Sequence, residues 1–78
     1  MGEYFWYRTR AGVFRIVRDG AKWRPMLEDE VLMGRYDSPQ SALDDLAHGH
    51  TDWPSCGDPS ELGLPEEIDG WEHRRSSR

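Results

Sequence analysis

The sequence predicts a small α+β domain: a three- to four-stranded antiparallel sheet followed by one helix packed on it, with an ordered C-terminal wrap of short turns. Three observations lead to this prediction. The first third is rich in aromatic and β-branched residues, which favour strands. One segment combines helical spacing with capping signals. The last third is rich in Pro, Gly and acids, yet it keeps two tryptophans and several large aliphatic residues, which a disordered tail rarely carries.

The strand signals lie before residue 37, in the runs EYFWYRTR, VFRIVR, KWRPML and, more weakly, VLMGRY. In the second run, alternation places Phe14 and Ile16 on one face and the neighbouring residues on the other. Asp19-Gly20 predicts a hairpin with a type I′ turn, because both central residues of that turn need positive φ. Pro25 donates no backbone hydrogen bond, so the third strand should be an edge or irregular.

The helix signals lie in the segment SPQSALDDLAHGH. Ser38 is a good N-cap and Pro39 a good first helical residue. Gly49 suits the left-handed residue that follows a helix. The apolar stripe that should dock this short helix consists of Ala42, Leu43, Leu46 and Ala47.

The chain has 78 residues, which predicts one domain, assigned here to residues 1–72. Residues 73–78, HRRSSR, are expected to form a mobile basic tail. Two short turns, around DPSEL and LPEEI, should belong to the C-terminal wrap.

Several classes of protein are disfavoured by composition. A single cysteine excludes an internal disulfide and a four-cysteine zinc site. No apolar run approaches the ~18 residues of a membrane span. The N-terminus has no basic region followed by an apolar one, so no secretory signal is expected and the predicted location is the cytoplasm.

The residue types that carry chemistry do not form a recognisable site. His48, His50, Asp52 and Cys56 are all metal-ligand types, but their spacing matches no structural zinc signature. Histidines that simply end a helix explain the pattern more economically, and whether these residues bind metal stays open. We therefore predict no catalytic residues, no cofactor and no enzymatic activity.

Charge is distributed unevenly along the chain, whose net charge is −5. Residues 1–24 hold six basic and two acidic residues, whereas residues 25–72 hold one basic and thirteen acidic residues. Opposite charges on neighbouring elements are ordinary within one fold. The acids could instead bind a basic partner or mimic DNA, as small phage inhibitors do. The candidate acidic contact residues are Asp44, Asp45, Asp52, Glu61, Glu66 and Glu67.

Aromatic residues and arginines are interleaved in the predicted sheet, a pattern that can stack bases and contact phosphates. The candidate nucleic-acid-binding residues are Tyr4, Trp6, Arg8, Arg10, Arg15, Arg18 and Arg24. The acidic stretch opposes this alternative, because nearby acids weaken phosphate contacts. If these arginines share one exposed face with aromatics, the nucleic-acid hypothesis gains support.

Over roughly residues 4–72 the chain resembles a group of small bacterial proteins that carry a domain of unknown function. The matching positions are Gly34, Tyr36, Ser38, Pro39, Ala42, Asp45, Leu46, Gly49, Leu62, Gly63, Pro65 and Trp71. The resemblance implies no activity and no site residues. The function we predict is a small, non-enzymatic bacterial protein that acts through protein–protein contacts; the partner and the oligomeric state stay open.

Overall fold

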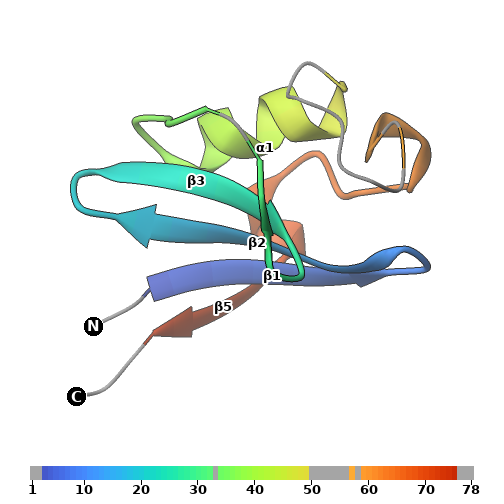
Figure 1. Ribbon diagram of the computed structural model, residues 1–78, viewed down its shortest axis with the longest axis horizontal. Helices are drawn as coiled ribbons and strands as arrows, with labels where there is room; N and C mark the ends of the chain where they lie inside the picture. Colours follow the sequence, from blue (N-terminus) through green and yellow to red (C-terminus); the bar gives the residue numbers. More distant parts are fainter. Residues whose placement is uncertain (1–2, 33, 50–56, 58, 76–78) are drawn as a thin grey trace.

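A five-stranded antiparallel sheet with one helix on one of its faces forms the domain (Figure 1). The computed structural model describes residues 3–75 except 33, 50–56 and 58. The strand order is β4-β3-β2-β1-β5. The strands are β1 (Glu3–Thr9), β2 (Gly12–Asp19), β3 (Lys22–Leu27), β4 (Glu30–Val31) and β5 (Glu72–Arg75). The helices are α1 (Pro39–Ala47) and the 3₁₀ turns η1 (Pro59–Glu61) and η2 (Ile68–Gly70).

The predicted α+β class with an antiparallel sheet is confirmed, but the number of strands is wrong: the sheet has five strands, not three to four. The additional strand is β5, which pairs antiparallel with β1. Without β5, the outer backbone N–H and C=O groups of β1 would form an unpaired edge. Pairing with β5 covers this edge along Glu3 to Trp6.

The predicted C-terminal wrap is also wrong. The C-terminal segment runs beside α1 through η1 and η2 and then joins the sheet. Leu64 and Trp71, which are 8% and 5% exposed, reach the same core as α1. Residues 73–75, expected to belong to a mobile tail, lie in β5, so the ordered domain extends past residue 72.

The hairpin between β2 and β3 forms where Asp19-Gly20 predicts it, but with a different turn. Asp19 pairs with Lys22, so Gly20 and Ala21 are the two central residues. Gly20 has a φ of 66°, whereas Glu28 is the one non-glycine residue with positive φ in the described chain. A type I′ turn needs positive φ at both central positions, so its assignment is wrong and the pattern fits type II′.

Pro25 lies inside the sheet without weakening the β2–β3 pairing. Its carbonyl accepts a hydrogen bond from the Leu32 N–H at 3.0 Å, so its backbone polar groups face away from β2. On that outer side, β3 pairs with two-residue β4 and, through Trp23, with Tyr36. The missing N–H therefore falls at an interrupted edge, where proline is tolerated.

The core lies between α1 and one face of the sheet. As the alternation predicts, Phe14 and Ile16 point to this face and are fully buried. Leu43 and Leu46 of α1 are also fully buried in the same cluster. Burying each such side chain stabilises the fold by about 1.5–3 kcal/mol. Trp23 and Leu27 of β3 extend the cluster.

The start and end of α1 agree with the sequence signals. The Ser38 hydroxyl accepts a hydrogen bond from the Ser41 N–H at 3.1 Å, and Pro39 is the first helical residue. Gly49 follows the helix with a φ of 73°. The Nδ1 atom of His48, the C-cap residue, lies 2.7 Å from the Asp44 carbonyl oxygen. His48 thus helps to end the helix.

Replacing the N-cap serine should weaken α1 and, through it, the core. Ser38→Ala is expected to lower the free energy of unfolding by about 1 kcal/mol, because the Ser41 N–H loses its acceptor. Ser38→Asp keeps an acceptor and should stay near the wild type. Urea denaturation followed by circular dichroism measures both, and equal losses in the two variants would contradict the capping role.

Tyr36 should make stability depend on pH in alkaline solution. Burial and a hydrogen bond to Asp45 raise the pKa of Tyr36 from 10.0 to about 12. The protonated Tyr36 hydroxyl therefore contributes fully to the free energy of unfolding below pH 10. This contribution is lost as the pH rises through 12. Between pH 9 and 11, wild type should lose about 1 kcal/mol more than Tyr36→Phe. Denaturation of both proteins at the two pH values measures this difference, and parallel losses would refute it.

Candidate functional site

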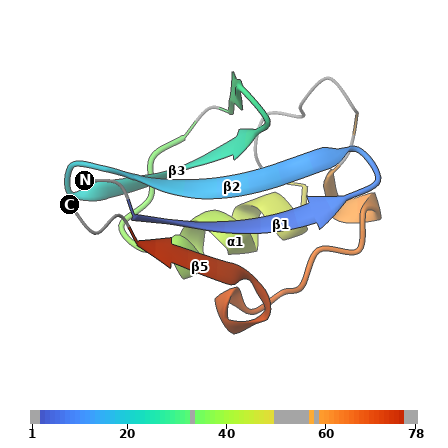
Figure 2. The same cartoon turned by 90° about the horizontal axis from the view of Figure 1, so that it is seen from below.

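The sheet has a second face that carries no helix or turn of the described chain. Figure 2 shows this face in front, with α1 behind it. Paired residues on neighbouring strands point to the same side, so the residues that alternate with the buried ones define it. We call it the open face. Its residues are Tyr4, Trp6, Arg8, Val13, Arg15, Val17, Arg24, Met26, Val31, Glu72 and Arg74, and the pair Asp19 and Lys22 ends the face at the β2–β3 turn.

The strand register arranges these side chains in rows across the sheet. One row runs through Arg74, Tyr4, Val17 and Arg24. Directly opposed side chains lie about 4.5–5.5 Å apart at Cβ. Tyr4 therefore has an arginine as its neighbour on β5.

The second row runs through Glu72, Trp6, Arg15, Met26 and Val31. Trp6 thus has an arginine as its neighbour on β2. Most apolar side chains of the open face are half-buried, and Val31 is 50% exposed. The face presents aromatic and aliphatic surface between guanidinium groups.

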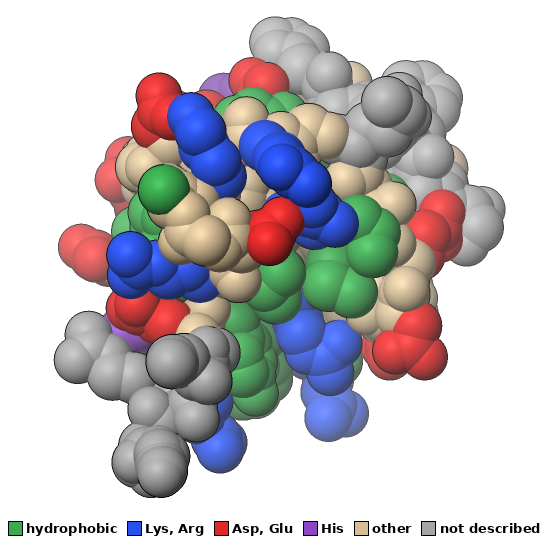
Figure 3. Space-filling view, turned by 60° about the vertical axis from the view of Figure 1, so that its left-hand side comes forward, with side chains coloured by type: hydrophobic (Ala, Val, Ile, Leu, Met, Phe, Trp, Pro, Cys, Tyr) green, Lys and Arg blue, Asp and Glu red, His purple; other side chains and the backbone are tan. Residues whose placement is uncertain are grey.

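Positive charge dominates the open face, which carries four arginines and one lysine against one glutamate and one aspartate. Arg15 Nη1 donates to the Glu28 carbonyl oxygen at 3.2 Å, so its hydrogen-bond acceptor there is a neutral group. Arg24 Nη2 contacts Oδ2 of Asp19, the last residue of β2, at 2.6 Å. Figure 3, in which the β2–β3 hairpin end of the molecule comes forward, shows Lys and Arg side chains beside both hydrophobic and acidic ones.

The structure brings together most of the predicted nucleic-acid-binding residues. Five of the seven lie on the open face: Tyr4, Trp6, Arg8, Arg15 and Arg24.

The other two predicted arginines lie elsewhere. Arg18 is on the core side of β2, where its guanidinium carbon lies 5.8 Å from the Trp23 ring centroid and its Nη1 lies 3.4 Å from Glu3 Oε1. Arg10 is in the β1–β2 turn and donates to the Glu61 carbonyl oxygen at 3.3 Å.

The described members of the predicted acidic contact set lie on the other side of the sheet, on α1 and the C-terminal segment beside it. Asp44 accepts a hydrogen bond from the Gln40 amide at 2.9 Å, and Asp45 hydrogen-bonds to the Tyr36 hydroxyl. Glu61, Glu66 and Glu67 are exposed, and Asp52 is outside the described residues. The acidic partner surface and the DNA-mimic hypothesis stay predictions.

Only one of the four candidate metal ligands, His48, lies in the described part of the chain. His48 contacts the Asp44 carbonyl oxygen, as described above. Among the residues described, no three His, Cys, Asp or Glu side chains are grouped closely enough to hold a metal ion. His50, Asp52 and Cys56 are outside that part of the chain.

Sequence reasoning did not assign Arg74, Met26 or Arg35 to the open face or its border. Arg74 was expected in a tail, although the alternation of Glu72 and Arg74 suits a strand with one solvent-exposed face. Met26 alternates with buried Pro25 and Leu27, a signal that was available. Arg35 reaches the border only because the segment after β4 folds back along β3, which no local pattern indicates.

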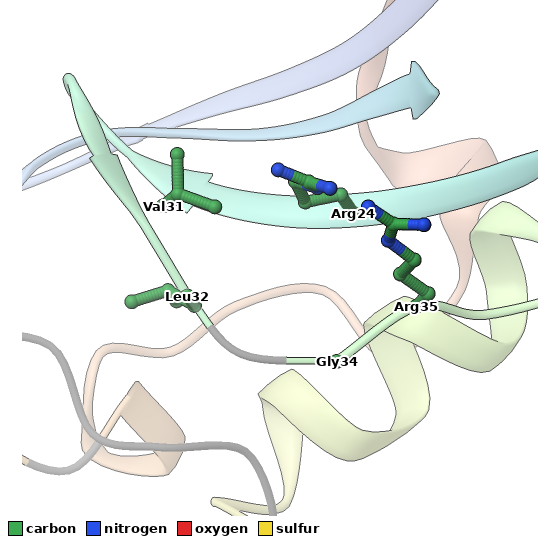
Figure 4. Close-up of a pocket in the computed structure, with 5 residues that line it drawn as sticks. All are labelled: Arg24, Val31, Leu32, Gly34 and Arg35. Carbon is green, nitrogen blue, oxygen red and sulfur yellow. The ribbon is translucent and has the colours of Figure 1, made fainter. Parts of the chain in front are cut away.

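A shallow pocket of about 220 Å³ lies where the open face meets this returning segment. It is lined by Arg24, Val31, Leu32, Gly34 and Arg35 (Figure 4). Two of these residues are cations, and the others offer aliphatic side chains or bare backbone. Such a lining suits an anionic group attached to an apolar one.

The described segments contain no helix with the length and apolar character needed to cross a membrane. Comparison of the chain with protein-family models, with curated proteins and with solved structures gives no match.

Proposed function

We propose that this protein is a non-enzymatic binding module and that the open face is its contact surface for another protein. One observation carries the proposal: tryptophan, tyrosine, methionine and four arginines share one sheet face that the described chain leaves without a covering layer. Trp, Tyr and Arg dominate the binding energy of protein interfaces, where Met is also enriched and Lys, Glu and Asp are depleted. The two rows of the open face hold three arginines and one glutamate, and its lysine and aspartate lie only at the β2–β3 end.

The titratable groups of this surface favour binding over catalysis. Arginine stays protonated and donates hydrogen bonds without exchanging a proton at neutral pH. General acid–base chemistry needs a group whose pKa lies near the working pH. The arginines of the open face can therefore orient and attract a partner, but they are poor proton donors or acceptors.

The charge of the open face argues for a partner with acidic groups. Its four arginines face one way, while Asp44, Glu66 and Glu67 lie in the helical layer behind the sheet. Such separation steers an acidic surface toward the arginines and repels it from the opposite side. It therefore favours one orientation of binding.

Single-stranded nucleic acid is the second candidate, favoured by the placement of Tyr4 and Trp6. These residues are two positions apart on one strand, so their rings can project from the same face about 6.6–6.8 Å apart along the strand. Successive bases can stack on such a pair, and the arginines can contact phosphates. The acidic residues of α1 and of the C-terminal segment weaken the long-range attraction of a polyanion to the arginines of the open face.

The open face should tolerate truncation better than the core. Trp71→Ala empties a site that is 5% exposed and should cost about 3–5 kcal/mol of folding free energy. Trp6→Ala removes a half-buried ring and should cost about 1 kcal/mol, leaving a folded protein. Thermal denaturation distinguishes the two; a loss from Trp6→Ala as large as from Trp71→Ala would make Trp6 a core residue.

Binding of the partner should depend on the open face and not on the opposite side of the sheet, which carries α1, η1 and η2. Tagged wild type, Trp6→Ala, Arg15→Gln and the control Glu66→Gln are used to capture partners from lysate of the source cells, with and without nuclease. We expect a protein retained by wild type and Glu66→Gln to be lost from the two open-face variants. Retention of the same protein by all four would contradict the proposal, and loss of capture after nuclease would favour nucleic acid.

A further inference from the structure

The pocket at the border of the open face holds two guanidinium groups side by side. Trp23 and Tyr36 exchange two backbone hydrogen bonds, of 2.7 and 2.9 Å, which hold the returning segment beside β3. The antiparallel register of this bridge places Arg35 next to Arg24, on the side opposite the Trp23 ring. Figure 4 shows the two guanidinium groups close together above the pocket.

One carboxylate of the protein already lies between these cations. Asp19 Oδ2 is 2.6 Å from Arg24 Nη2 and 3.6 Å from Arg35 Nη2. One negative charge therefore serves two positive ones. The Arg35 side chain is 64% exposed, and its contact with Asp19 is the longer one. Its guanidinium can therefore receive a second oxyanion.

Exchange of this carboxylate for another should cost little. The Asp19 side chain is 44% exposed, and exposed ion pairs contribute little to stability because water screens them. The position of Asp19 also shows which group fits, since a planar carboxylate matches the donor geometry of a guanidinium. A phosphate dianion would meet stronger repulsion from Asp19.

We propose that the pocket binds an acidic side chain of the partner, with Arg24 and Arg35 holding its carboxylate and exposed Val31 contacting an apolar neighbour in the same peptide. Asp19 is then an internal competitor that occupies the arginines in the free protein. This inference rests on the proposed protein-binding role of the open face and names the chemistry of the partner at one edge of that face.

The test uses a blocked peptide of alternating Glu and Leu as the probe, and the same peptide with Gln in place of Glu. The side-chain Nε–Hε signals of Arg24 and Arg35 are followed by NMR in the intact protein at low ionic strength. We expect saturable shifts of both signals with the Glu peptide and none with the Gln peptide. Equal shifts with both peptides, or none with either, would overturn the inference.

Three variants make the test specific. Arg35→Gln should weaken Glu-peptide binding at least fivefold, and Asp19→Asn should strengthen it severalfold by removing the competing carboxylate. Lys22→Gln is the matched control: it removes the same charge from an exposed residue that pairs with Asp37 outside the pocket. Equal weakening by Arg35→Gln and Lys22→Gln would show only general charge attraction and would overturn the proposed carboxylate site. Weaker binding of the Glu peptide to Asp19→Asn than to wild type would also overturn it.

Failure of the pocket and failure of the proposed function give different results. If capture of the partner is lost with Trp6→Ala but kept with Arg35→Gln, the open face binds protein and the pocket inference falls. If a single-stranded oligonucleotide shifts both arginine signals and the Glu peptide shifts neither, the pocket recognises phosphate and the carboxylate assignment is overturned. Circular dichroism confirms that each variant is folded.

Discussion

The packing of a single short helix on one side of the sheet is the constraint on which the rest of the structure depends. A helix with its side chains is about 10 Å wide, whereas five strands span about 19 Å. Leu43 and Leu46 therefore cover only part of the core side. Leu64 and Trp71 complete it, and these residues come from the C-terminal segment. The described chain has no further layer for the second side of the sheet.

The open face follows from this shortage of covering structure. Trp6 and Met26 stand there among arginines whose aliphatic stems can lie along apolar neighbours while the charged ends reach water. The arginines that make this uncovered sheet face compatible with water also leave it able to bind a partner. Aromatic surface supplies contact area, and guanidinium groups supply direction and charge.

Charge completes the distinction between the two sides of the molecule. The sequence shows basic and acidic stretches, but ion pairing between strands and helix would have been an equally reasonable outcome. Instead Arg18 pairs with Glu3, and Arg24 and Arg35 share Asp19, so these arginines contact acids of the sheet and its turns. The acids of α1 make other contacts, to Gln40 and Tyr36 among them.

The sequence by itself determined the local elements, because their causes are local. Ser38 and Gly49 bound the helix through capping and positive φ, and alternation in β2 assigns Phe14 and Ile16 to the core. Only the tertiary structure decided how distant segments meet. β5 pairs with a strand some seventy residues earlier, and its residues carry no apolar run to announce it. The pairing of Arg35 with Asp19 likewise depends on a chain reversal held by Trp23 and Tyr36. The alternation within a strand does not say which distant strand it pairs with, because every residue offers the same backbone N–H and C=O groups. For this reason the edges of the sheet and the border of the open face could not be predicted from the sequence.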